Sequence, residues 1–159
     1  MSFTTNLDLT KVEQGAKDWH IEWGSNLDIL DAVIGKIKLT DGSSGALEAG
    51  MPVYISAAST VSLADATDGT KPAAAFCRTT DGTTARIRQY GIAQAVITVG
   101  EADIVPGDLV FLSTTPGKVT KTPPAASGNV IQVLGRAVTA EAAGKVDILL
   151  AINFNPVEV

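Results

Sequence analysis

The chain has one histidine and one cysteine, the side chains most often used for acid–base and nucleophilic chemistry near neutral pH. His20 lies between two tryptophans, away from any Gly-x-Ser-x-Gly pattern of a serine hydrolase. Cys77 stands inside an apolar run, where a free cysteine is usually buried and inert. We therefore expect His20 on a surface or interface and Cys77 in the core. A small hydrolase using Cys77 or a serine is the least favoured function.

Metal and cofactor chemistry find little support in the residue pattern. A single histidine excludes a multi-histidine metal site, and a zinc site is not expected. The acidic residues near turns lack the spacing of a calcium-binding loop, so we interpret them as turn caps. The glycines form neither a dinucleotide-binding loop nor a phosphate-binding P-loop. We predict no catalytic residue, no metal and no cofactor.

The most basic segment contains Arg86 and Arg88, which share one face of a predicted strand with Thr84 and Tyr90. The whole chain is acidic, with 12 basic and 17 acidic residues and a net charge of −5. A nucleic-acid-binding protein needs concentrated positive charge to displace counterions, so no nucleic-acid partner is expected. We interpret Arg86 and Arg88 as part of a solvated or intersubunit face that meets carboxylates.

Residues 16–34 have the apolar stripe of an amphipathic helix, with spacings of three and four residues. Gly24-Ser25 leaves open whether this is one kinked helix or two short ones. Such short helices are marginal unless they dock. Docking on the chain's own β-domain and docking on a partner are both open. The candidate interface residues on this stripe are Trp19, Trp23, Leu27, Leu30 and Ile34.

After residue 36 the pattern changes to short apolar runs separated by Gly, Pro and Asp turns, which is typical of an all-β domain. We expect an N-terminal arm and helix over residues 1–36 and a β-domain over residues 37–159. The strands are predicted at 37–40, 51–57, 60–64, 73–78, 84–90, 92–99, 109–114, 118–122, 130–138 and 145–153.

The β-domain contains an internal repeat. Four elements recur in the same order, an arrangement that predicts two similar β-modules over about 45–100 and 101–155. The fold class is therefore mainly β, with the modules fused into one small barrel or sandwich behind a short helical segment. The alignment places 50–56 on 107–113, Val61 on Val119, 73–78 on 131–136, and 84–88 on 145–149.

The last predicted strand is apolar on both faces. Val146 and Ile148 lie on one face, and Leu149 lies on the other. A strand that is apolar on both faces needs cover on both. We therefore add Leu149 to the candidate interface residues and expect a homo-oligomer, with a trimer favoured.

These segments resemble a known family. GDLVFL at 107–112, GKV at 117–119, VLGRA at 133–137 and VDILL at 146–150 are similar to the small β-barrels that tailed bacteriophages encode beside their major capsid protein. Those proteins are capsid decoration, or cement, proteins and head-fibre proteins. The segments WHIEW at 19–23 and NLDILD at 26–31 look like the heads of phage fibre and structural proteins.

The resemblance implies a non-enzymatic virion protein, an oligomer on the capsid surface that binds the major capsid protein and stabilises the shell. A phage tail-fibre or receptor-binding module is the alternative. The sequence predicts neither a secretory signal nor a membrane-spanning segment, and its single cysteine cannot form an intrachain disulfide. We therefore expect synthesis in the cytoplasm of a bacterial host, followed by assembly into the virion.

Overall fold

The structure is a computed structural model that describes Ser2–Phe3, Thr10–Lys11 and residues 37–67, 69–100 and 103–159. The chain divides into two units, Met1–Lys36 and Ile37–Val159. In the first unit, β1 (Ser2–Phe3) pairs antiparallel with β2 (Thr10–Lys11). The predicted helix lies outside the described residues, together with Trp19, Trp23, Leu27, Leu30 and Ile34.

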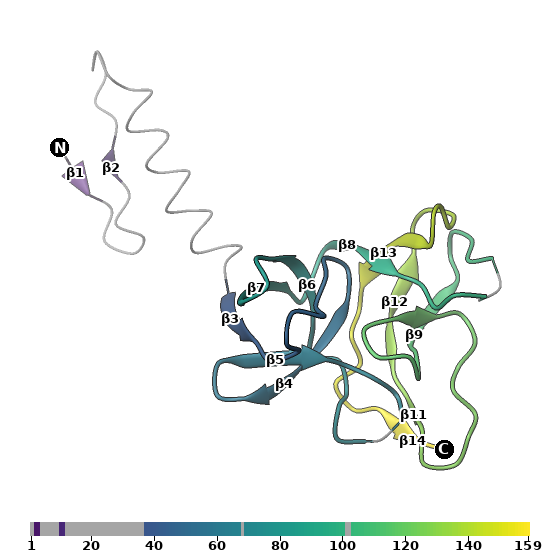
Figure 1. Cartoon of the computed structure of the whole chain (residues 1–159). Coiled ribbons are helices and arrows are strands. Elements are labelled where there is room, and N and C mark those ends of the chain that lie inside the picture. Colours follow the sequence, from purple (N-terminus) through teal and green to yellow (C-terminus); the bar gives the residue numbers. More distant parts are fainter. Residues whose placement is uncertain (1, 4–9, 12–36, 68, 101–102) are drawn as a thin grey trace. The chain divides into compact units, whose positions relative to one another are not determined.

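The second unit begins with a closed five-stranded barrel, in the order β3-β5-β4-β6-β7 (Figure 1). Along 84–88, buried Ala85 and Ile87 alternate with more exposed residues, because one face of this strand lines the barrel interior. The prediction of a mainly β fold with a small barrel is confirmed. The barrel strands are β3 (Ile37–Asp41), β4 (Pro52–Ala57), β5 (Thr60–Leu63), β6 (Ala75–Thr80) and β7 (Thr84–Arg88).

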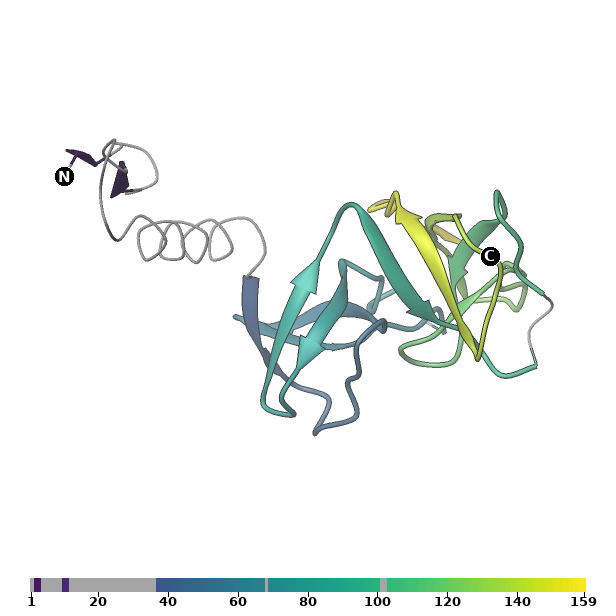
Figure 2. The same cartoon turned by 90° about the horizontal axis from the view of Figure 1, so that it is seen from above.

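A second five-stranded sheet follows, in the order β10-β9-β12-β13-β8, and lies beside the barrel in both cartoon views (Figures 1 and 2). Two short strands form a separate antiparallel pair: β11 (Val130–Ile131), which precedes β12 in the chain, and β14 (Val157–Glu158), which follows β13. The sheet strands are β8 (Ile92–Val96), β9 (Leu109–Leu112), β10 (Val119–Thr120), β12 (Val133–Ala137) and β13 (Lys145–Leu150).

The barrel and the second sheet share one pairing scheme. In each, the first strand pairs with the last, the second and third form a hairpin, and the fourth lies between the second and the last. The residue registers agree as well. Equivalent cross-strand pairs are Tyr54–Ser62 and Phe111–Thr120, Lys38–Arg86 and Gln94–Asp147, and Phe76–Arg88 and Arg136–Leu149.

The closing contact of the barrel also recurs. In the barrel, the Gly42 amide donates to the Val61 carbonyl oxygen at 2.8 Å, next to the parallel β3–β5 pairing. In the second sheet, the Thr98 amide donates to the Val119 carbonyl oxygen at 3.0 Å, beside a parallel bridge between Ile97 and Val119. This single bridge lies just after β8 and is the counterpart of the parallel pairing that closes the barrel, although the second half remains a sheet.

One strand of the repeat is displaced from its alignment in the sequence. The Cys77 amide donates to the Met51 carbonyl oxygen, and the Ala137 amide donates to the Asp108 carbonyl oxygen, so Cys77 and Ala137 are equivalent. The sequence alignment instead places Cys77 on Gly135, two residues earlier. The difference arises between the third and fourth strands of each half: Ala137 lies 18 residues after Val119, whereas Cys77 lies 16 residues after Val61.

The two halves are joined by a continuous core and by close backbone contacts. Buried residues of the first half, including Phe76, pack in the same cluster as Leu112 and Ile148 of the second. Gly50 adopts a φ of +91°, and a Cβ atom there would collide with the Gln94 carbonyl oxygen. The junction therefore requires glycine at this position.

A buried amide interrupts the predicted strand over 130–138. Gln132 is fully buried, and its side chain accepts a hydrogen bond from the Ala73 amide at 2.7 Å. It also donates to the carbonyl oxygens of Ala73, at 2.9 Å, and Asn153, at 2.8 Å. The chain therefore forms two shorter strands, β11 and β12, on either side of Gln132.

Candidate interaction surface

The outer faces of the two halves are structurally equivalent and chemically different. The register places Gln94 at the position of Lys38, Asp147 at that of Arg86, and Leu149 at that of Arg88. The barrel therefore presents cations where the second sheet presents apolar, amide and acidic side chains. We call the first surface the basic face, made of Lys38, Arg78, Arg86 and Arg88. We call the second the apolar face, made of Ile92, Leu109, Val138 and Leu149 around Arg136.

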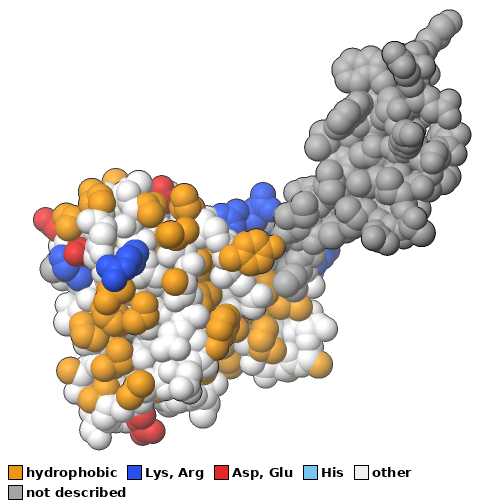
Figure 3. Space-filling view, turned by 180° about the vertical axis from the view of Figure 1, so that it is seen from behind, with side chains coloured by type: hydrophobic (Ala, Val, Ile, Leu, Met, Phe, Trp, Pro, Cys, Tyr) orange, Lys and Arg blue, Asp and Glu red, His pale blue; other side chains and the backbone are white. Residues whose placement is uncertain are grey.

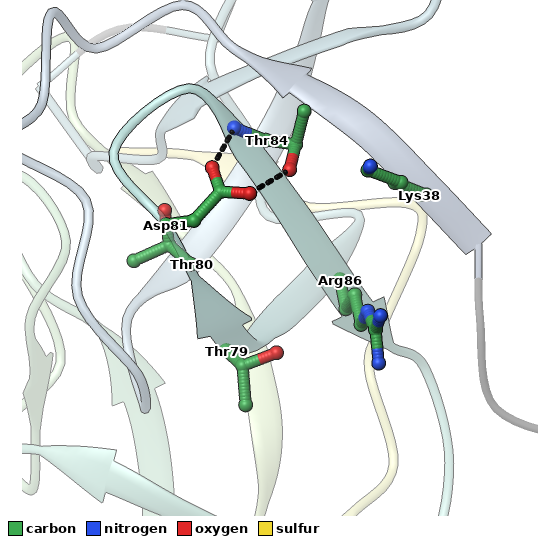
Figure 4. A pocket seen from close by; sticks show the side chains of 6 residues that line it. All are labelled: Lys38, Thr79, Thr80, Asp81, Thr84 and Arg86. Carbon is green, nitrogen blue, oxygen red and sulfur yellow. Dashed lines mark hydrogen bonds between the residues drawn. The ribbon is translucent and has the colours of Figure 1, made fainter.

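The basic face contains a pocket of about 160 Å³ lined by polar side chains from β3, β6 and β7. Lys38 and Arg86 are direct cross-strand partners, and Arg86 is in turn opposite Thr79. Figure 4 shows Lys38 and Arg86 on neighbouring strands, with Asp81 and Thr84 at the turn end of the pocket. The lining residues are Lys38, Thr79, Thr80, Asp81, Thr84 and Arg86.

Asp81 fixes the turn beside this pocket. Its carboxylate accepts hydrogen bonds from the Thr84 hydroxyl at 2.7 Å, the Thr84 amide at 2.7 Å and the Thr83 amide at 3.0 Å. These hydrogen bonds, led by the one from the Thr84 hydroxyl, together with the charge of Lys38, lower the pKa of Asp81 to about 2. Asp81 is therefore ionised at neutral pH, and both of its oxygens are already engaged by the turn.

The other two arginines of the basic face lie nearer the second sheet. Arg88 is half-buried and donates from its guanidinium to the carbonyl oxygen of Ile92, at the start of β8. Arg78, at the bulge of β6, lines a second pocket with Arg88, beside Ala93 and Gln94. Arg86 and Arg88 lie on the same face of β7, as predicted, because the alternate residues Ala85 and Ile87 are buried in the barrel.

The apolar face is a cross-strand row on the outside of the second sheet. Leu109 pairs with Arg136, Arg136 with Leu149, and Leu149 with Ile92. Leu149 is 51% exposed and Ile92 is 53% exposed. Val138 follows in the next row, where its amide donates to the Asp147 carbonyl oxygen. Large apolar side chains that gather on one exposed sheet face are typical of an interaction surface.

Seen from behind, hydrophobic side chains gather in several clusters over the Ile37–Val159 unit, with few charged groups between them (Figure 3). On β13, the face with Val146 and Ile148 is buried as predicted, and the face with Leu149 is exposed. Cover of Leu149 by a partner remains a prediction.

Cys77 is 2% exposed, so its predicted burial is confirmed. Desolvation by burial, together with the nearby charge of Asp41, raises the pKa of the Cys77 thiol to about 11. The thiol is therefore protonated at neutral pH, and the thiolate is the nucleophilic form of cysteine. Within the described residues, no three of the His, Cys, Asp and Glu side chains are grouped as metal ligands would be.

Several residues of these faces could not be predicted from the sequence. Lys38 lies on the first strand of the barrel, and Ile92 lies on the first strand of the second half. The alignment of the repeat did not include these two strands, and the sequence does not show which strands they pair with. Tyr90 was predicted inside a strand, and this is wrong: β7 ends at Arg88, and Tyr90 is 68% exposed on the connection to β8. Gly91, with a φ of +83°, follows it and turns the chain.

Comparison with known proteins assigns no family. No family model matches the chain, and no curated protein is significantly similar to it in sequence. In the part of the chain that the structure describes, no helix has the length and hydrophobicity needed to cross a bilayer.

Proposed function

We propose that this chain is a non-enzymatic structural protein of the virion, a decoration protein that binds the head lattice of a tailed bacteriophage. The observation that carries the proposal is the apolar face, where Leu149 and Ile92 lie side by side and half exposed on a small, tightly packed β-unit. Such a face gains free energy when a partner covers it, at about 25 cal/mol per Å² of apolar surface. The resemblance of 107–150 to phage decoration proteins directs the choice of partner to the major capsid protein.

The stabilising effect follows from mass action. A protein that binds only the assembled shell lowers the free energy of that shell relative to its dissociated or ruptured forms. No reaction at a catalytic centre is needed, and a protonated, buried Cys77 is unsuited to nucleophilic attack. We propose a homo-oligomer, with a trimer favoured, because three copies add their contacts to one lattice site.

Co-sedimentation tests this function. The purified chain is mixed with shells assembled from the major capsid protein of the same phage, and bound protein is measured after pelleting. We expect saturation at a fixed ratio of chain to capsid subunit and a higher temperature of shell disruption. A chain that stays in the supernatant at micromolar concentration, with no change in shell stability, contradicts the proposal.

A receptor-binding module of a phage fibre is the second candidate. Exposed aromatic side chains on connections are typical of sugar-binding surfaces, since a ring presents an apolar face beside polar groups. Tyr90 is 68% exposed after β7, and Phe154 is 66% exposed after β13. Binding to host cell envelopes, lost on Tyr90→Ala or Phe154→Ala, would favour this candidate over the decoration protein.

A further inference from the structure

The basic face of the barrel carries two neighbouring cations, Lys38 and Arg86. Lys38 and Arg86 lie directly opposite each other on β3 and β7, so their side chains leave the same face of the sheet. Like charges in this arrangement repel and destabilise a sheet. Within the described part of the chain, no hydrogen bond or ion pair engages the Lys38 ammonium or the Arg86 guanidinium.

Asp81 does not neutralise the pair. It is the only acidic residue among the described residues that line the pocket, and its oxygens accept three hydrogen bonds from Thr83 and Thr84. Two basic side chains and one carboxylate among the described lining residues give a formal charge of +1 (two cations minus one anion). A monoanion balances this charge, and a dianion would reverse it.

The geometry of the donors favours a planar anion. A guanidinium presents two parallel N–H groups that match the two oxygens of a carboxylate, and an ammonium adds a third donor. The hydroxyl of Thr79, next to Arg86 across β6–β7, lines the same pocket. A volume of about 160 Å³ is enough for the end of one acidic side chain and a few water molecules.

We propose that the Lys38–Arg86 pocket binds a carboxylate group presented by an acidic side chain of a protein partner. The identity of that partner rests on the proposed function, in which it is the major capsid protein; the site itself does not. The second half of the unit has Gln94 and Asp147 at the equivalent positions and therefore lacks the site. The duplicated fold thus carries one polar and one apolar contact surface.

Titration of the isolated full chain with sodium acetate, followed by amide NMR at constant ionic strength, tests the site without any capsid. We expect saturating shifts at Thr79, Thr84 and Arg86, and none at Thr139, Lys145 and Asp147 of the second half, which serve as the control within the same spectrum. Arg86→Gln and Lys38→Gln should each weaken binding about tenfold, corresponding to about 1.4 kcal/mol. Lys145→Gln should leave the binding unchanged.

Small linear shifts that are equal in both halves would overturn the site, as would an Arg86→Gln variant that is folded and still binds acetate normally. Inorganic phosphate, titrated under slightly alkaline conditions where it is mostly a dianion, should bind more weakly than acetate. Tighter binding of phosphate would overturn the assignment to a carboxylate. Acetate binding without capsid binding would reject the proposed function alone, and capsid binding without acetate binding would reject the site alone.

Discussion

Leu149 lies directly opposite Ile92 across β13 and β8, and more than half of each side chain is exposed. In the barrel, the residue at the position of Leu149 is Arg88. The same fold position therefore carries a cation in one half and an apolar side chain in the other. We therefore expect the fold to tolerate a charged side chain at position 149 as well.

The variant Leu149→Arg tests the apolar face. We expect a change of less than about 1 kcal/mol in the free energy of unfolding, because the site is exposed and strand preferences span only that range. Self-association or capsid binding should weaken by about 2 kcal/mol or more, as for loss of an interface hot spot. Sedimentation equilibrium and urea unfolding give the two values.

Ile55→Arg is the matched control, because Ile55 has the same exposed fraction as Ile92, 53%, and lies on β4 of the barrel. It should not alter association. Equal losses in both variants would mean that the apolar face has no special role.

Gln132→Leu tests the buried amide that joins the two halves. The substitution leaves the buried amide and carbonyl groups of Ala73 without their partner, and each such group costs about 1–3 kcal/mol. We expect the free energy of unfolding to fall by about 2–4 kcal/mol in urea. The exposed Gln94 provides the control: Gln94→Leu should change the value by less than about 0.5 kcal/mol. Similar small effects at both positions would contradict the structural role of Gln132.

The buried thiol of Cys77 should make the free energy of unfolding depend on pH. Its pKa is about 11 in the folded chain and 9.0 in the reference state, so the folded state holds the proton more tightly between these values. The free energy of unfolding should therefore decline from pH 9 to pH 11. Cys77→Ala should show a smaller decline over the same range when stability is measured by urea unfolding. Rapid labelling of the native chain by a bulky thiol reagent at neutral pH would contradict the burial of Cys77.

Deletion of residues 1–35 tests the role of the N-terminal segment. Since Ile37–Val159 forms a unit with its own core, we expect a soluble, folded β-domain. Association should weaken by at least a few kcal/mol, on the order of a hot-spot pair. Trp19→Ala/Trp23→Ala in the full chain should reproduce most of this loss. A deletion variant that assembles normally would show that the segment does not mediate docking, and an unfolded one would show that it belongs to the core; either result would contradict this prediction.

The sequence predicted those features that depend on local alternation. Arg86 and Arg88 point outwards because Ala85 and Ile87 fill the barrel, and Val146 and Ile148 are buried for the same reason. This pattern has a period of two residues and is visible in any short window.

Features that depend on contacts distant in sequence were missed. The second half has two more residues than the barrel between its third and fourth strands, so the alignment fell two residues short there. The Thr98–Val119 hydrogen bond links the segment after β8 to β10, and these two segments are separated in the chain by β9. The Lys38–Arg86 pair joins two residues nearly a whole module apart, and only the register of β3 and β7 brings them together.

Cryo-electron microscopy of the phage particle tests the central claim most directly. The two joined β-halves of residues 37–159 give a recognisable density, with one closed barrel and a second sheet of the same strand order. We predict this density at regular positions on the head lattice, with the apolar face of Leu149 and Ile92 covered by capsid protein or by another copy. Density confined to the tail or its fibres, with a bare head lattice, would contradict the account.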